Sequence, residues 1–158
     1  MEIKNFKFKK KYGQNFLIDS NITNKIANVI KDKANSLVIE IGCGDGRLTK
    51  QLCTYYDKVL CYEIDEEVIP YLKDNLKEYN NYNVILGDFL KRDVNSDIKL
   101  FKYDKLYVVA NLPYYITTPI IEKIINSKID ADTLVFMVQK EVGDRFSAKV
   151  GTKEYSSL

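Results

Sequence analysis

The stretch Ser36–Leu52, "SLVIEIGCGDGRLTKQL", decides the fold of this 158-residue chain. It opens with an apolar run from Leu37 to Ile41, which is typical of a strand buried on both faces of a sheet. Glycines follow at alternate positions, at Gly42, Gly44 and Gly46. A helix is expected from about Arg47. A strand, a glycine-rich turn and a helix in this order favour an α/β fold.

The alternation of strands and helices continues outward from this unit. Strands are expected in "KVLCYEID", at about 83–86, in "KLYVVANL" and at 133–139. Helices are expected at about 66–78, from Pro119 with Thr118 as its cap, and in "KEVGDRFSAK". Upstream, Ile18, Ile22, Ile26 and Val29 or Ile30 recur at helical spacing, with Asp19 or Ser20 as the cap. The pattern predicts a doubly wound parallel sheet of the Rossmann type.

Composition removes several classes of chemistry. The sequence has no histidine, which excludes Ser-His-Asp triads, and its three cysteines show no CxxC pairing, so we expect no metal. No apolar run reaches the length of a membrane span, and the N-terminus does not resemble a signal peptide. A cytoplasmic location and no membrane partner are therefore expected.

Acidic residues mark three of the predicted strands: Glu40, Glu63 and Asp88. A carboxylate after the second strand suits the hydroxyls of a ribose, as Glu63 would do. Asp88 suits the exocyclic amine of adenine, and the Phe89 ring could stack on the base. The glycine turn reads GxGxG and holds no lysine for phosphates, which favours S-adenosylmethionine over a nicotinamide cofactor. Each carboxylate taken alone could instead be a helix cap or a solvated charge.

The stretch Val108–Tyr115, "VVANLPYY", ends another apolar run at a polar residue. Open α/β sheets bind ligands at such strand ends. Pro113 fixes its own φ and biases Leu112 toward extended geometry, so the Asn111 side chain and the Leu112 carbonyl are predicted to form a pair of acceptors. The alternative is that these residues form only a turn.

A basic arm is expected at residues 1–12, ahead of a single domain at 13–158. Its lysines alternate with aromatic rings, a pattern that suits phosphate contact and base stacking. The lysines predicted to bind RNA are Lys7, Lys9, Lys10 and Lys11. A solvated arm without a partner is the alternative.

The motifs "YGQNFLIDSNI", "VIEIGCGDGRLT", "CYEID", "GDFL" and "NLPYYIT" together resemble the family of ribosomal RNA adenine dimethyltransferases that modify the small subunit. The resemblance implies S-adenosylmethionine as cofactor, bound by Asn15, Leu17, Gly42, Gly44, Glu63, Asp88, Phe89 and Asn111. It also implies that the target adenine is held by Asn111, Leu112, Pro113 and Tyr114. The expected partner is small-subunit ribosomal RNA or a pre-ribosomal particle.

Two alternative functions are also compatible with these motifs. The erythromycin-resistance methyltransferases of large-subunit rRNA share much of the pattern, and a non-catalytic assembly factor would also bind pre-ribosomal RNA. Members of the family add further strands and a small helical domain after the point where "GTKEYSSL" ends this sequence. We therefore expect a C-terminally truncated sheet whose fifth strand leaves one edge unpaired, an arrangement that invites self-association.

Overall fold

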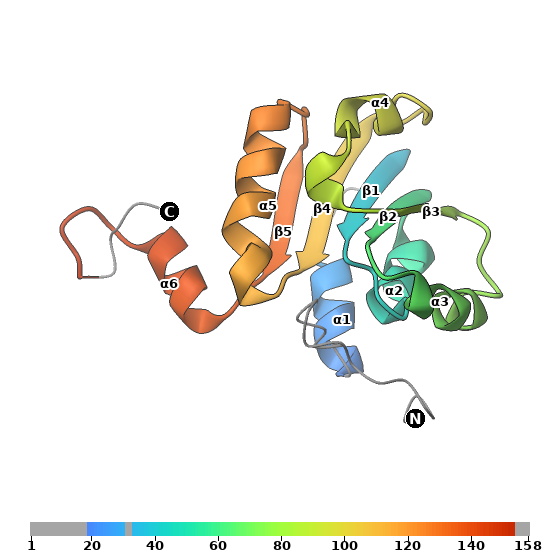
Figure 1. The fold of residues 1–158 in the computed structure, drawn as a ribbon, viewed down its shortest axis with the longest axis horizontal. Helices are drawn as coiled ribbons and strands as arrows, with labels where there is room; N and C mark the ends of the chain where they lie inside the picture. Colours follow the sequence, from blue (N-terminus) through green and yellow to red (C-terminus); the bar gives the residue numbers. More distant parts are fainter. Residues whose placement is uncertain (1–18, 31–32, 154–158) are drawn as a thin grey trace.

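The computed structural model describes residues 19–30 and 33–153. Its centre is a five-stranded sheet in the order β3-β2-β1-β4-β5, in which all neighbouring strands are parallel. The strands are β1 (Ser36–Ile41), β2 (Lys58–Glu63), β3 (Tyr82–Leu86), β4 (Lys105–Asn111) and β5 (Thr133–Met137). Figure 1 shows the arrowheads of β4 and β5 at the lower side of the sheet, where the carboxyl ends of these strands lie.

Helices cover both faces of the sheet. They are α1 (Ser20–Ala27), α2 (Arg47–Tyr55), α3 (Ile69–Asn75), α4 (Val94–Ile98), α5 (Tyr114–Ser127) and α6 (Lys140–Ser147), with short 3-10 turns η2 (Glu66–Val68) and η3 (Phe89–Lys91). One apolar cluster joins α1, α2 and α3 to the side of β1 that carries Val38. The other joins α4 and α5 to the side that carries Leu37 and Ile39. The predicted doubly wound α/β sheet is thus confirmed.

The first predicted helix is present, but its buried face differs from the prediction. Asp19 is the N-cap, and its side chain accepts from the N–H of Asn21 at 2.8 Å. Ile26 and Ile30 are buried as predicted, whereas Ile22 and Val29 are largely exposed. Thr23 and Ala27 take their place on the buried face. Small side chains allow the helix to lie close to α2, which hydrophobic periodicity alone does not indicate.

The predicted start of the helix at Pro119 is wrong. α5 begins at Tyr114, with Pro113 as its N-cap at φ −62° and ψ 145°, and Pro119 lies inside the helix. The Thr117 hydroxyl supports the earlier start by donating to the Pro113 carbonyl at 3.0 Å. Pro119 has no N–H to donate to the carbonyl four residues before it, so the helix continues with one backbone bond fewer.

The predicted helix at 66–78 is also shorter than expected. A 3-10 turn capped by Asp65 comes first, and α3 then runs over Ile69–Asn75 with Pro70 in its first turn. The Asp65 carboxylate accepts from the N–H of Glu67 at 3.2 Å. Proline at this position is compatible with a helix start because the N–H that it lacks would have had no partner within the helix.

The last two elements, β5 and α6, are only weakly covered by the rest of the described structure. Among the described residues, β5 pairs with β4 alone, and no residue of β5 or α6 is fully buried. Figure 1 shows α6 standing away from the sheet beyond α5. Within residues 19–30 and 33–153, none of the helices is long and apolar enough to cross a membrane.

Candidate cofactor and target-base site

The glycine turn after β1 adopts the backbone conformation that glycine favours. Gly42, Gly44 and Gly46 have φ values of +76°, +55° and +84°. The Gly42 N–H donates to the Tyr62 carbonyl at 2.8 Å, which holds the turn against β2. A Cβ atom at Gly42 would meet nothing within 4 Å, so the turn borders open space at the carboxyl end of the sheet. A ligand can therefore approach the backbone here, as the sequence predicts.

Glu63 ends β2 and binds the glycine turn. One carboxylate oxygen accepts from the N–H of Gly44 at 2.7 Å, and the other accepts from Ile64 at 2.8 Å and Asp65 at 2.9 Å. Burial raises the pKa of the Glu63 carboxyl, while the three N–H groups oppose that rise. A carboxylate has about four lone-pair directions, so a ligand hydroxyl would use the remaining one or share the others.

Glu40 lies beneath the turn rather than in the site. Its side chain is 1% exposed within β1, and the Cys61 thiol donates to it at 3.8 Å. Burial raises the pKa of the Glu40 carboxyl to about 8. The group therefore keeps its proton to a higher pH than an exposed glutamate does, and its hydrogen bond joins β1 to β2.

The charge pair between Asp45 and Arg47 escaped the sequence analysis. The Asp45 carboxylate, which is buried, lies 2.8 Å from the Arg47 guanidinium Nε, and Asn75 donates to the Asp45 carbonyl at 2.8 Å. The ion pair connects the glycine turn to the start of α2, and the Asn75 bond connects the turn to α3. The sequence signal was an acidic residue inside the turn with an arginine two positions later.

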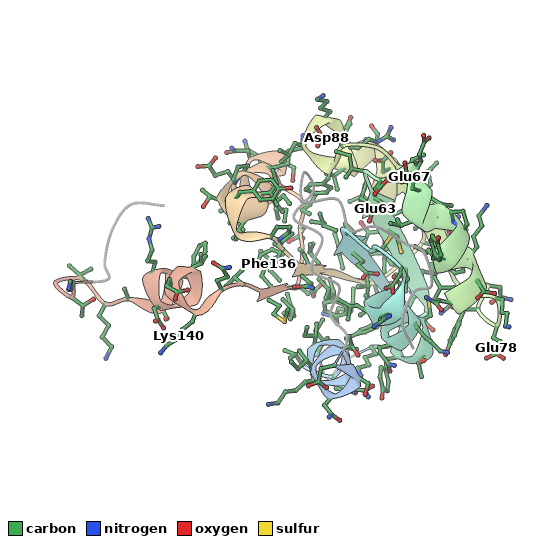
Figure 2. The ribbon with its side chains drawn as sticks, turned by 60° about the horizontal axis from the view of Figure 1, so that its bottom comes forward. Glu63, Glu67, Glu78, Asp88, Phe136 and Lys140 are labelled. Carbon is green, nitrogen blue, oxygen red and sulfur yellow. The ribbon has the colours of Figure 1, made fainter. Side chains whose placement is uncertain are left out.

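Asp88 lies on the same side of the molecule as Glu63, as Figure 2 shows. Its carboxylate caps η3 by accepting from the N–H of Leu90 at 3.0 Å, and its side chain remains 31% exposed. Phe89 is buried, with 6% of the residue exposed, and its ring packs edge-on against Tyr62 at 5.0 Å between centroids. In this geometry Phe89 offers little surface to a base, and its predicted stacking stays a prediction.

Two exposed apolar side chains near Glu63 were not singled out from the sequence. Ile64, the next residue, is 45% exposed, and Leu86, the register partner of Glu63 on β3, is 49% exposed. Apolar side chains at the ligand-binding end of a sheet are suitable surfaces for a flat ring. Only the structure identifies them, because both read as ordinary strand residues.

The "NLPY" residues lie at the end of β4, beside the glycine turn. The register pairs Ile41 with Ala110, so Gly42 and Asn111 are the next residues on two neighbouring strands. The Leu112 N–H donates to the Met137 carbonyl at 3.2 Å, and its side chain is buried. The structure thus brings Asn111 and Leu112 to the same end of the sheet as Glu63 and Asp88.

Several predicted site residues cannot be placed. Asn15, Leu17 and the lysines Lys7, Lys9, Lys10 and Lys11 lie outside the described residues, as does the side chain of Tyr114. Within the described part of the chain, no group of three or more cysteine, aspartate or glutamate side chains could hold a metal ion.

The sheet order, the glycine turn after β1 and the acidic residues at the end of β2 and after β3 define the Rossmann-like fold of class I methyltransferases. A family model described as ribosomal RNA adenine dimethylase matches residues 5–158. The chain belongs to the ribosomal RNA adenine dimethylase family.

Curated relatives match nearly the whole chain. A ribosomal RNA small subunit methyltransferase A of Staphylococcus epidermidis is 50% identical over 155 residues, which are 97% of this chain and 52% of the relative. One of Listeria monocytogenes is 51% identical over 156 residues, which are 97% of this chain and 53% of the relative. The chain therefore spans about half the length of these relatives.

Solved structures agree with this placement. A dimethyladenosine transferase from Plasmodium falciparum is 36% identical, with a TM-score of 0.75 over 90% of this chain and 50% of that one. The 23S rRNA methyltransferase ErmE is 27% identical, with a TM-score of 0.66 over 83% of this chain and 50% of that one.

Proposed function

We propose that this chain carries the cofactor and target-base site of an enzyme that uses S-adenosylmethionine to dimethylate N6 of adenines in a loop of small-subunit ribosomal RNA. The observation that carries the proposal is the position of Asn111 and Leu112 next to Gly42, at the sheet end that also holds Glu63. Family membership supports the substrate, because the named relatives are small-subunit ribosomal RNA methyltransferases. Such an enzyme would act in the cytoplasm.

The described residues fit an adenosine-containing cofactor. Open space borders Gly42, the Glu63 carboxylate suits the ribose, and the part-exposed Asp88 carboxylate suits the adenine amine. Ile64 and Leu86 would contact the faces of the ring, a role that the sequence alone favours for Phe89. By family resemblance, Gly44, Asn15 and Leu17 complete this site. When bound, S-adenosylmethionine supplies a methyl group on a positively charged sulfur.

The target amine would be held by two acceptors. The amine of adenine is a weak nucleophile because its lone pair is delocalised into the ring. The Asn111 amide oxygen and the Leu112 carbonyl each accept one N6 hydrogen, which draws the nitrogen toward a pyramidal geometry. Pro113 keeps Leu112 extended, and Tyr114 stacks on the base. Asparagine performs this role without adding a negative charge beside the cofactor's sulfur.

Positioning accounts for most of the proposed catalysis. The base must leave its stack to reach this pocket, which costs least in a hairpin loop or single strand. Once both reactants are held in line, orientation can lower the barrier by about 7–11 kcal/mol in favourable cases. The methylated amine loses its proton to solvent, so no strong general base is required. A second cycle on the monomethylated base gives the dimethyl product.

The test measures methyl transfer from radiolabelled S-adenosylmethionine to under-methylated small ribosomal subunits. Because the chain spans about half of its relatives, a version extended with the remaining length of the Staphylococcus epidermidis relative is compared with it. We expect dimethyladenine in small subunits, with lower turnover for the shorter chain. Transfer to large subunits instead would favour the erythromycin-resistance reading, and binding without transfer by both versions would favour an assembly factor.

Two sets of variants locate the chemistry. Asn111→Ala should abolish transfer while weakening cofactor binding far less, because its main proposed role concerns the target amine. A proportional loss of cofactor affinity would place Asn111 in the cofactor site instead. Replacing Lys7, Lys9, Lys10 and Lys11 by alanine should lower RNA affinity and reduce the log-log salt slope by about 0.7–0.9 for each phosphate that is no longer neutralised. An unchanged slope would show that the arm does not bind RNA.

A further inference from the structure

A polar network of two buried residues, Tyr62 and Asp97, and the part-exposed Arg92 lies close in sequence to the two carboxylates of the site. The Tyr62 hydroxyl donates to the Asp97 carboxylate at 3.0 Å, although the two residues are 35 positions apart in sequence. Arg92 binds the same carboxylate with two guanidinium nitrogens, of which Nε lies 3.1 Å from Oδ2. Tyr62 and Asp97 are 1% and 6% exposed. The network joins β2, the segment after η3 and α4.

Tyr62 connects the network to both carboxylates of the proposed cofactor site, to Glu63 through the chain and to Asp88 through Phe89. Tyr62 immediately precedes Glu63 on β2. Its ring packs edge-on against Phe89, which immediately follows Asp88. The residue before Glu63 therefore contacts the residue after Asp88. At the carboxyl ends of these strands, a backbone bond also joins β3 to β2: the Gly87 N–H donates to the Glu63 carbonyl at 2.7 Å.

Packing alone does not require this network. A phenylalanine at position 62 would fill the same space against Phe89 without a buried hydroxyl. Burying Asp97 carries a desolvation cost, which its paired hydrogen bonds offset only when the geometry is complete. Burial and the bond to Asp97 also raise the pKa of the Tyr62 hydroxyl, which keeps it a donor at all physiological pH values. The bonds of Arg92 and Tyr62 to Asp97 instead restrain the position of η3, a turn of three residues.

We propose that Tyr62, Asp97 and Arg92 are positioning residues that set the Asp88 carboxylate relative to Glu63, and thereby determine selectivity for the adenine amine of the cofactor. This inference rests on the proposed use of S-adenosylmethionine. None of the three residues is proposed to contact the cofactor. Tyr62 acts through Phe89, and the Arg92–Asp97 pair holds the backbone that follows η3.

The experiment compares the affinities of two ligands by calorimetry: S-adenosylhomocysteine, and its analogue with hydrogen in place of the adenine N6 amine. A hydrogen bond to a charged group corresponds to a preference of roughly 10- to 150-fold for the amine. We expect this preference in the parent chain and a reduction to within about threefold in Tyr62→Phe. The preference for the ribose 2′-hydroxyl, measured with the 2′-deoxy analogue, should stay at the parent value in the same variant.

Tyr56→Phe is the matched control. Tyr56 is also a buried tyrosine, and its hydroxyl donates to the Ala27 carbonyl at 2.8 Å in the apolar cluster on the other face of the sheet. Loss of this bond should destabilise the chain without changing the preference for the amine. If Tyr62→Phe does not fold, Arg92→Gln tests the same network, because the Arg92 side chain is 42% exposed.

The outcomes separate the two proposals. A parent chain that binds neither ligand would overturn the cofactor proposal together with this one. A parent chain that prefers the amine, with Tyr62→Phe or Arg92→Gln retaining the full preference, would overturn only the positioning network. Equal reduction in Tyr56→Phe would show that the effect follows general loss of stability, and would also overturn it.

Discussion

The strands β1 and β2 inside the sheet differ in burial from β5 and α6 at one of its edges. Every residue of β1 is buried, and so are all residues of β2 except the first. No residue of β5 or α6 is buried to that degree, and Phe146 and Val150 are exposed. The glycine turn and Glu63 adjoin the buried strands β1 and β2, whereas Asp88 follows β3 at the sheet edge opposite β5. Folding stability and cofactor binding should therefore depend on the centre, and the β5 side should contribute chiefly to contacts with other molecules.

The largest contrast should appear in core truncations. Leu60 is 1% exposed in β2, and Leu60→Ala should lower the free energy of unfolding by about 2–5 kcal/mol, because less apolar surface is buried and a cavity remains. Phe146→Ala on α6 should change it by no more than about 0.5 kcal/mol. Urea denaturation followed by circular dichroism measures both. Similar losses would show that α6 is part of the cooperative core.

The next contrast concerns cofactor binding. Glu63→Ala should weaken S-adenosylmethionine binding by roughly 1.5–3 kcal/mol, because it removes a charged acceptor for the ribose and the anchor of the Gly44 N–H. Glu66→Ala is the control, since Glu66 is exposed three residues later in η2. Calorimetry that gives the parent affinity for Glu63→Ala would contradict the assignment of this carboxylate.

The pH dependence of stability should come from the centre as well. Burial raises the pKa of Glu40 from 4.5 to about 8, so the folded chain holds a proton that the unfolded chain has lost. The contribution of Glu40 to stability should be fully present below pH 4.5 and be lost as the pH rises to about 8, by at most about 1.4 kcal/mol per pH unit.

Glu40→Gln separates this contribution from the others. Because glutamine does not titrate, the decline between pH 4.5 and about 8 should become shallower than in the parent chain. Denaturant midpoints at intervals of one pH unit measure it. An identical slope in both proteins would mean that another group, such as Glu63, whose pKa burial also raises, carries the dependence.

The smallest effect should be self-association through the β5 edge. Leu134 is 41% exposed on this strand, and exposed apolar edges favour pairing between chains. Sedimentation velocity should show a concentration-dependent increase in mean mass. Leu134→Lys should reduce it with little change in stability. A monomer at every concentration would show that this edge does not associate.

The elements that the sequence predicted well are those with one strong local signal. The apolar runs of β1 and β4 and the glycine turn depend on few competing choices, so their positions agree closely with the prediction. The start of α5 was missed because Pro113 and Pro119 are both compatible with a first turn, and tertiary contacts at Leu112 favour the earlier one.

Side-chain roles are harder to predict from sequence where packing decides between two uses of one residue. Phe89 follows an acidic residue and therefore resembles a stacking ring, but its ring packs against Tyr62 in the core. The bond between Tyr62 and Asp97 spans 35 positions of sequence, and no periodic pattern indicates it. Glu40 and Glu63 look equivalent in sequence, yet only Glu63 is placed at the border of the site.

The most direct test of the proposed cofactor site compares S-adenosylmethionine with NAD as ligands for this chain by isothermal titration calorimetry. Asp45 places a carboxyl group one residue before Gly46, the N-cap of α2, near where a dinucleotide would put its pyrophosphate, whereas Glu63 and Asp88 suit an adenosine. We expect binding of S-adenosylmethionine with at least about tenfold preference over NAD, a difference of about 1.4 kcal/mol. Equal or tighter binding of NAD would contradict the assignment of this site to S-adenosylmethionine.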